Sequence, residues 1–223
     1  MLGRILRQLF SRDGPALQPP AAVPPAAALK LNLGSGQNPL AGYVNVDLYG
    51  TPDVKWDLER FPWPWESDSV EEIRMSHVLE HLGQSSPVFI GVMKELYRVC
   101  RHGARIHIQV PHPRHDFFLG DPTHVRVILP ATLELFSLKR NLAWEAQGLP
   151  NTPLATYHGV DFDLEETQIV LDEPYASQLG DGSLTREEAV AIARRYNNVV
   201  TEIKMTLRVV KAPAQGNVSR AQR

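Results

Sequence analysis

The sequence predicts an α/β protein with a mostly parallel sheet, an antiparallel closing strand and helices on both faces. Short apolar segments of strand type alternate along the chain with segments of helical periodicity, and this order builds parallel sheets. The last apolar segment, residues 199–210, alternates as a long closing strand does. Ligand sites in such sheets lie at the carboxyl ends of the strands, so the residues that follow each strand are the candidates for function.

Turn residues separate the predicted strands, which are residues 29–33, 43–48, 54–57, 69–75, 104–111 and 199–210. Residues 87–100 place apolar side chains at helical spacing, and Arg101-His102-Gly103 is expected to end this helix with a cation and a glycine. We expect a short helical piece at residues 131–136 and a further helix at residues 185–196.

The chain is expected to contain one folded domain with irregular ends. Residues 1–12 have the pattern of a short basic amphipathic helix, which indicates either a contact to a membrane surface or a partner protein, or a helix without that role. Residues 13–28 are rich in Pro and Ala and predict a linker. Residues 29–211 are expected to form the domain, and residues 112–165 within it are expected to be a substrate-facing insertion. Residues 212–223 are expected to be a disordered tail.

The composition of the chain limits which partners and which cellular compartment are expected. A chain of 223 residues, 43% of them hydrophobic, is long enough for one domain with a substantial core, and its net charge of -2 does not favour nucleic acid as a partner. The single cysteine, Cys100, cannot form an internal disulfide and fits a reducing compartment. No apolar run is long enough to span a membrane. We expect a cytoplasmic protein, peripheral to the inner membrane if residues 1–12 act as an anchor.

A glycine turn follows the first predicted strand, in the run Leu31-Asn32-Leu33-Gly34-Ser35-Gly36. Such a pair of glycines also occurs in plain tight turns, so the surroundings must decide its meaning. A dinucleotide site needs a third glycine, a helix facing the pyrophosphate and an acid about 20 residues further on. Here Pro39 takes the third glycine position, and only ten residues separate Gly36 from Asp47. This geometry suits a cofactor without phosphates.

The sequence resembles the small bacterial methyltransferases of class I, which use S-adenosylmethionine. Residues 31–47 look like their first two motifs, residues 56–62 and 68–82 are similar to the segment through their fourth strand, and residues 95–103 match the element before their fifth strand. The resemblance covers about residues 29–111 and implies a Rossmann-like methyltransferase domain. It departs at Asn32, where many members have an acid.

The predicted cofactor site combines backbone and carboxylate contacts. Glycines let the backbone approach the methionyl end of S-adenosylmethionine, and Asp47 at the end of the second strand can accept hydrogen bonds from both ribose hydroxyls. Asp57 would lie near the adenine amino group and Leu58 against its ring. The alternative for either aspartate is a helix or turn cap. The candidate cofactor-binding residues are Asn32, Leu33, Gly34, Ser35, Gly36, Asp47, Leu48, Asp57, Leu58, Ser76 and His77.

Three histidines beyond the fifth strand are candidates for a general base. A histidine with a pKa near neutrality can remove a proton from the methyl acceptor. His112 follows the strand end most closely and is the first candidate, followed by His115 and His124. Each of them can also be structural, and Arg126 can hold an anionic or sugar substrate.

One histidine-containing pattern in the sequence is compatible with a metal site. His77-x-x-Glu80-His81 matches the pattern of an inverted zinc protease helix, but it falls inside the methyltransferase resemblance and the sequence assigns no third ligand. Some quinone O-methyltransferases have a Glu-His pair at the similar position, so Glu80 and His81 could bind a divalent ion. The alternative is that they simply begin the next helix.

These observations favour methyl transfer from S-adenosylmethionine to a small-molecule or glycan acceptor, at oxygen. The segment after the fourth strand is Ser76-His77-Val78-Leu79, not the Asn/Asp-Pro-Pro-aromatic segment of DNA amino-methyltransferases. Two alternatives stay open. One is N-methylation of a protein or RNA, and the other is a module that binds S-adenosylmethionine without transferring its methyl group.

Overall fold

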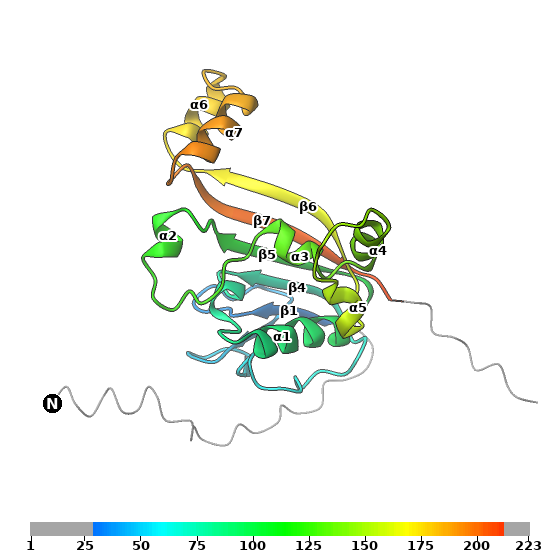
Figure 1. Ribbon diagram of the computed structural model, residues 1–223. Helices are drawn as coiled ribbons and strands as arrows, with labels where there is room; N and C mark the ends of the chain where they lie inside the picture. Colours follow the sequence, from blue (N-terminus) through cyan, green and yellow to red (C-terminus); the bar gives the residue numbers. More distant parts are fainter. Residues whose placement is uncertain (1–28, 212–223) are drawn as a thin grey trace, which may run out of the picture.

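A computed structural model describes residues 29–211, which form a single sheet with its helices (Figure 1). The sheet has 7 strands in the order β3-β2-β1-β4-β5-β7-β6. Strands β1 to β5 run parallel, and β7 pairs antiparallel with β5 and β6. This confirms the predicted fold class. The strands are β1 (Leu29–Leu33), β2 (Val44–Asp47), β3 (Val54–Lys55), β4 (Val70–Ser76), β5 (Cys100–Pro111), β6 (Phe162–Leu171) and β7 (Val200–Val209).

The expectations for residues 1–12, 13–28 and 212–223 fall outside the described residues. Within residues 29–211 no helix is long and apolar enough to cross a membrane. The helices are the 3-10 helix η1 (Leu79–His81), α1 (Ser86–Val99), α2 (Asp116–Leu119), α3 (Pro130–Glu134), α4 (Leu138–Ala146), α5 (Leu154–His158), α6 (Tyr175–Asp181) and α7 (Arg186–Arg195).

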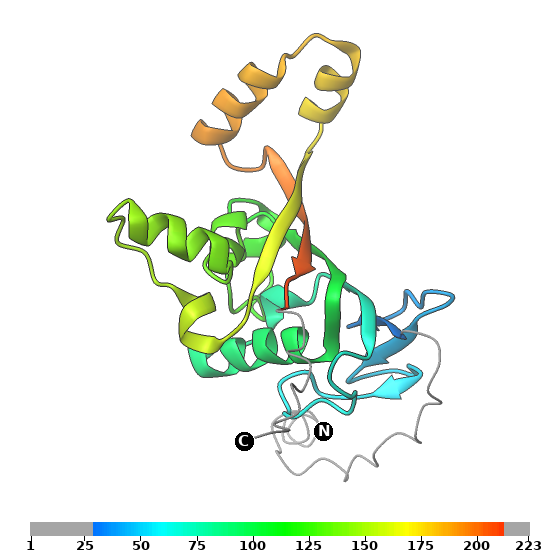
Figure 2. The same cartoon turned by 90° about the vertical axis from the view of Figure 1, so that its right-hand side faces the viewer.

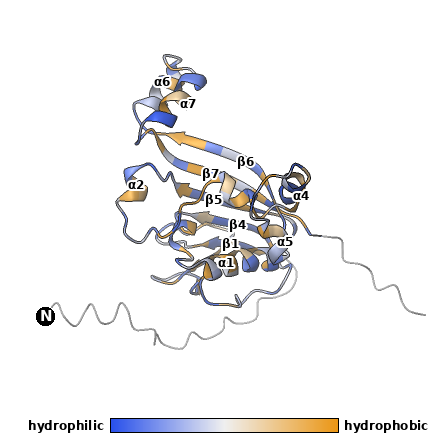
Figure 3. Cartoon of the chain, in the orientation of Figure 1, coloured by the Kyte–Doolittle hydropathy of each residue, from blue (hydrophilic) through white to orange (hydrophobic). Residues whose placement is uncertain are grey.

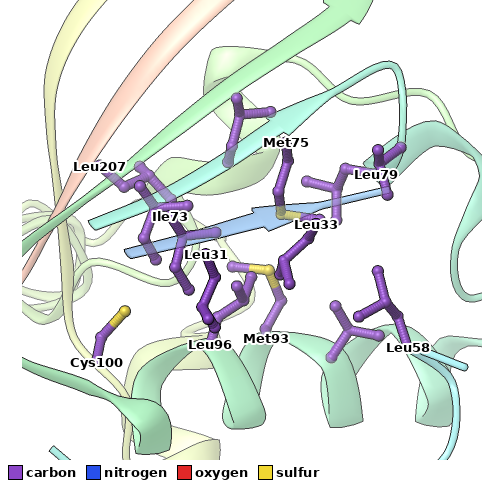
Figure 4. Packing of buried hydrophobic residues seen from close by; sticks show 14 of the residues in the cluster. Leu31, Leu33, Leu58, Ile73, Met75, Leu79, Met93, Leu96, Cys100 and Leu207 are labelled. Atoms are coloured by element: carbon purple, nitrogen blue, oxygen red, sulfur yellow. The ribbon is translucent and has the colours of Figure 1, made fainter. Parts of the chain in front are cut away.

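Helix α1 packs against the apolar face of the sheet. Pro87 lies in its first turn, where a missing N–H costs nothing, and its periodic apolar side chains face β1 and β4. Figure 4 shows Met93 and Leu96 of α1 against the sheet residues Leu31 and Leu33, all of them at most 1% exposed. Each such side chain contributes about 1.5–3 kcal/mol by leaving water. The core therefore fixes β1 and the turn that follows it.

The opposite face of the central strands is polar. Along β5, buried Ile106 and Ile108 alternate with half-buried His107 and Gln109, and hydrophilic and hydrophobic residues alternate in the same way along β7 (Figure 3). Because side chains alternate between the faces of a strand, this pattern separates a core face from a polar face. Among residues 29–211, apolar side chains of α1 and α3 belong to the same buried cluster as the apolar side chains of the sheet.

Some elements differ from the sequence-based expectation. Strand β6 was not predicted, because its middle residues are exposed and show no apolar alternation. Strand β5 begins at Cys100, so Arg101-His102-Gly103 lies inside the strand, with Gly103 at a φ of 78°. The predicted insertion, residues 112–165, contains α2 to α5 and reaches the first residues of β6.

Helices α6 and α7 extend from the end of the β6–β7 hairpin, away from the sheet (Figure 2). Thr185 caps α7, where its hydroxyl accepts the Glu188 N–H and the Glu188 carboxylate accepts the Thr185 N–H. This reciprocal cap explains why the helix begins close to the predicted residue 185.

Candidate functional site

The glycine turn after β1 needs both of its glycines for different reasons. Gly34 and Gly36 have φ angles of 65° and 50°, a region that favours glycine. At Gly34 a Cβ would also lie 2.3 Å from Cγ2 of Val78, whereas nothing lies within 4 Å of a Cβ at Gly36. Gly34 therefore permits close packing against the chain after β4, and Gly36 leaves open space beside the turn.

Asn45 holds the connection between β1 and β2, which contains no helix. Its side-chain oxygen accepts the Leu40 N–H at 2.7 Å, and its side-chain nitrogen donates to Asp53 at 2.9 Å. Asn32 donates to the same Asn45 oxygen at 2.9 Å and to the Asn38 carbonyl at 3.1 Å. These bonds explain Asn32, which orders the turn from a buried position on β1.

Asp47 closes the turn with its carboxylate. One oxygen accepts the Gly36 N–H at 2.8 Å, and the other accepts the Tyr49 N–H at 2.8 Å. Each carboxylate oxygen can accept more than one hydrogen bond, so capping and ligand binding are compatible at this residue. Asp47 thus ties the glycine turn to the end of β2.

The other candidates near the second and third strands differ in exposure. Leu33 is fully buried and offers only its backbone to a ligand, while Leu48 is half-buried. Asp57 accepts the Glu59 N–H at 2.9 Å as a turn cap. Leu58 is 6% exposed and points toward α1 (Figure 4).

A cleft of about 580 Å³ begins at the glycine turn and extends over the polar face of the sheet. This volume lies within the range of about 300–1,000 Å³ that is usual for ligand sites. Five of the candidate cofactor residues line it, together with polar side chains of β5, β6 and β7. The five are Asn32, Gly34, Ser35, Ser76 and His77.

His77 lies at the exit of β4 between two carboxylates. Its Nε2 donates to Glu202 at 2.8 Å, and its Nδ1 is 3.5 Å from Oε1 of Glu80. The Glu80 carboxylate, and more weakly Glu202, raise the pKa of His77 above its usual value, although burial opposes this. Gln109 also donates to Glu202, at 2.8 Å. The cleft therefore has a polar wall that can hold a charged or hydroxylated ligand.

Of the predicted bases, His112 and His115 lie beyond the end of β5. His112 is half-buried, and its Nδ1 accepts the Arg114 N–H at 3.2 Å. Burial, and then the positive charge of Arg114, lower the pKa of His112. His115 is 3% exposed and caps α2 with Nδ1, while its Nε2 donates to Asp172 at 3.1 Å.

His124 lies elsewhere, beside η1. Its ring stacks on Phe118 and packs edge-on against His81, and its Nε2 is 4.0 Å from Oε1 of Glu80. The structure therefore brings His124 to the Glu80-His81 pair, and also to Phe118 of α2, the helix that His115 caps.

Two residues in or beside the cleft were not identified from the sequence. Glu202 orients His77, and Lys204 lines the cleft from β7. Both belong to the closing strand, whose pairing with β5 brings them opposite Pro111 and Gln109. The sequence signal that could have identified them is the alternation of polar with apolar residues along the last strand, which places the polar residues on one face of the sheet.

A solved methyltransferase has this fold. The structure is similar to an S-adenosylmethionine-dependent methyltransferase from Archaeoglobus fulgidus, at 16% identity and a TM-score of 0.50, with 80% of this chain and 85% of that chain covered. A 1,6-didemethyltoxoflavin-N1-methyltransferase from Burkholderia thailandensis is similar at 12% identity and a TM-score of 0.46, over 82% of this chain and 72% of that chain. No protein-family model and no curated protein matches the sequence. At this identity the first similarity shows the fold alone, which is the Rossmann-like α/β fold that the sequence resemblance implies.

Proposed function

We propose that this protein is an S-adenosylmethionine-dependent methyltransferase. The observation that carries the proposal is the helix-free connection between β1 and β2, in which Asp47 closes the turn of Gly34 and Gly36 beside the cleft. A dinucleotide pyrophosphate needs a helix N-terminus at this place, whereas S-adenosylmethionine has no phosphate to neutralise. The turn offers backbone groups to the methionyl end, and the Asp47 carboxylate accepts the ribose hydroxyls.

The acceptor is proposed to be a small molecule or a glycan, methylated at oxygen. The polar wall of the cleft supports this, because Gln109 and Lys204 can hydrogen-bond the hydroxyl or acidic groups of such a substrate. Catalysis would come chiefly from holding the acceptor oxygen in line with the sulfonium methyl group, with His112 as the base that removes its proton. The reaction then yields the methyl ether and S-adenosylhomocysteine.

Calorimetry with S-adenosylhomocysteine, S-adenosylmethionine and NAD tests the cofactor. We expect the two sulfur compounds to bind with 1:1 stoichiometry and NAD not to bind. Binding of NAD without S-adenosylhomocysteine would contradict the proposal. Incubation of cell extracts with the protein and a labelled methyl donor, followed by mass spectrometry, identifies the acceptor. A labelled RNA or protein would replace the small-molecule proposal, and no labelled product would favour a module that binds without transferring.

Asp47→Ala should weaken the binding of S-adenosylhomocysteine by about 10- to 100-fold, because hydrogen bonds to a charged group are worth about 1.5–3 kcal/mol. Calorimetry measures the affinity, and circular dichroism checks that the variant is folded. Asp181→Ala is the matched control, since Asp181 accepts the Ser183 N–H at 2.9 Å just as Asp47 accepts the Tyr49 N–H. Equal affinities of the two variants would move the ribose site away from Asp47.

A further inference from the structure

Glu80 carries a buried carboxylate that has no hydrogen-bond partner. The Glu80 side chain is 1% exposed, and neither of its oxygens accepts a hydrogen bond from residues 29–211. The imidazoles of His77 and His124 approach it, with ring nitrogens at 3.5 Å and 4.0 Å from Oε1. Taking a carboxylate out of water is costly unless charge or hydrogen bonds compensate it. The position therefore calls for a further ligand of positive charge.

Two histidines lie near this carboxylate: His81, the next residue of η1, and His124, on the loop after α2. Glu80, His81 and His124 each offer one ligand atom within 4.8 Å of the others. The backbone holds them together, because the Glu80 carbonyl accepts the N–H groups of Val125 and Arg126 at 3.0 Å and 3.1 Å. The loop that carries His124 is thus fixed to η1 independently of any side-chain contact.

Hydrogen bonds set the tautomer of both imidazoles. Nδ1 of His124 lies 2.8 Å from the Phe118 carbonyl, which can only accept, so Nδ1 carries the proton and Nε2 is left with a lone pair. Nδ1 of His81 is 3.0 Å from the Thr123 hydroxyl, and that hydroxyl donates its own proton to Asp121 at 2.6 Å. Nδ1 of His81 must therefore donate as well, which leaves its Nε2 free.

This arrangement is the one that metal-binding histidines have. A ligating imidazole donates its second N–H to a carbonyl or a carboxylate-linked group, which fixes the ring and makes the other nitrogen more basic. Zinc accepts two histidines and one glutamate as its protein ligands, with a further position open to water. Two imidazole nitrogens favour a transition metal over magnesium, which prefers oxygen ligands.

We propose that Glu80, His81 and His124 bind one divalent transition-metal ion of the zinc type. Ligand atoms on one zinc ion lie about 3.4 Å apart, so small side-chain rotations close the cluster around the ion. The ion would compensate the charge of Glu80 and would join η1 to the loop of residues 121–126. The proposal concerns a site beside the cleft, and it holds whether or not the chain transfers methyl groups.

The test measures binding of Zn²⁺ to the full chain after dialysis against a chelator. We expect one equivalent of Zn²⁺ to bind and to raise the unfolding temperature, because a ligand that binds only the folded state stabilises it. His81→Ala and His124→Ala should each weaken binding by about 100-fold or more, since loss of a supporting residue already costs about 10- to 100-fold. His158→Ala, on α5 and outside the cluster, should leave the affinity unchanged.

Glu80→Gln keeps the shape of the side chain and separates metal binding from a purely structural role. We expect the metal-free variant to remain folded but to gain no stability from Zn²⁺. If Glu80 serves only His77, the substitution should lower stability equally with and without Zn²⁺, and this outcome would overturn the proposal. Binding that all three substitutions leave unchanged would equally reject the site and indicate adventitious zinc at other histidines. Co²⁺ adds a spectroscopic readout, since an ion in this site should show the visible absorption of a four- or five-coordinate complex.

Discussion

His112 has the protonation state that a general base needs. Its pKa is lowered by burial, so its imidazole is neutral at pH 7 and able to accept a proton. We expect His112→Ala to slow methyl transfer by about 10²- to 10⁴-fold, the usual contribution of such a base, while the affinity for S-adenosylhomocysteine stays unchanged. Turnover of the labelled acceptor and calorimetry measure the two quantities.

A control for His112 must remove a similar hydrogen bond. His102→Ala meets this need, because Nδ1 of His102 accepts the Lys211 N–H at 3.0 Å as Nδ1 of His112 accepts the Arg114 N–H. Normal turnover of His112→Ala, or an equal loss in His102→Ala, would reject His112 as the base.

Single residues were predictable where their role is local. Gly36 and Asp47 are joined by a hydrogen bond across a short connection, so their spacing in the sequence already limits how far apart they can lie. The meeting of His124 with Glu80 was not predictable, because it depends on a loop folding back onto η1. The assignment of cofactor and catalytic roles stays a prediction until binding and turnover are measured.

Helix α1 is attached to the chain before β4 through Glu95. This buried carboxylate accepts the Trp63 N–H at 2.6 Å and an Arg98 N–H at 2.7 Å, and Arg98 also donates to the Trp65 carbonyl at 2.8 Å. Burial raises the pKa of Glu95, but the bonds from Arg98 and Trp63 outweigh it and leave the pKa below its usual value.

A lowered pKa in the folded state makes the stabilisation by Glu95 depend on pH. It is present above the unfolded value of about 4.3 and is lost as the pH falls through the folded value. We therefore expect Glu95→Gln to lower the free energy of unfolding by about 1–3 kcal/mol at pH 7, and by progressively less below pH 4. Urea unfolding at several pH values measures this difference.

Glu145→Gln, on the exposed side of α4, is the control for this experiment and should change stability little at any pH. A loss in Glu95→Gln that stays constant down to pH 2 would show that the carboxylate charge is not the cause.

Elements were predictable where one face is buried. Helix α1 and strand β7 follow their apolar periodicity to within about one residue of the expected bounds. Strand β6 has only β7 beside it, so its side chains need no apolar pattern, and the backbone hydrogen bonds to β7 define it instead. The sequence of β6 alone therefore does not indicate a strand, because the pairing with β7 is what makes it one.

At the scale of the molecule, the β6–β7 hairpin separates α6 and α7 from the core, which includes none of their residues. We expect replacement of residues 174–197 by one glycine to leave a cooperative fold, with the unfolding temperature lowered by no more than about 4 °C. The Asp172 N–H donates to the Val199 carbonyl at 2.9 Å, so the turn between these two residues would contain Glu173, the new glycine and Asn198. Asn198, at a φ of 55°, then takes the third position, where such hairpins use a left-handed residue.

Thermal unfolding followed by circular dichroism measures this change. The shortened chain loses the hydrogen bonds from Arg114 to α7, which are at the surface, but keeps the pair of His115 and Asp172. Loss of cooperative unfolding would show that α6 and α7 support the sheet.

The position of β6 at the edge of the sheet also bears on self-association. Edge strands expose unpaired backbone groups that can join the sheet of another molecule, and charged side chains prevent this. Asp163, Glu165 and Glu166 lie along β6. Arg208 of the adjacent strand β7 pairs with Asp163, and Arg105 of β5 pairs with Glu165. The charged and exposed side chains in the middle of β6 are the reason that the sequence does not predict this strand. The same side chains keep the ten-residue edge from pairing with another molecule and starting aggregation.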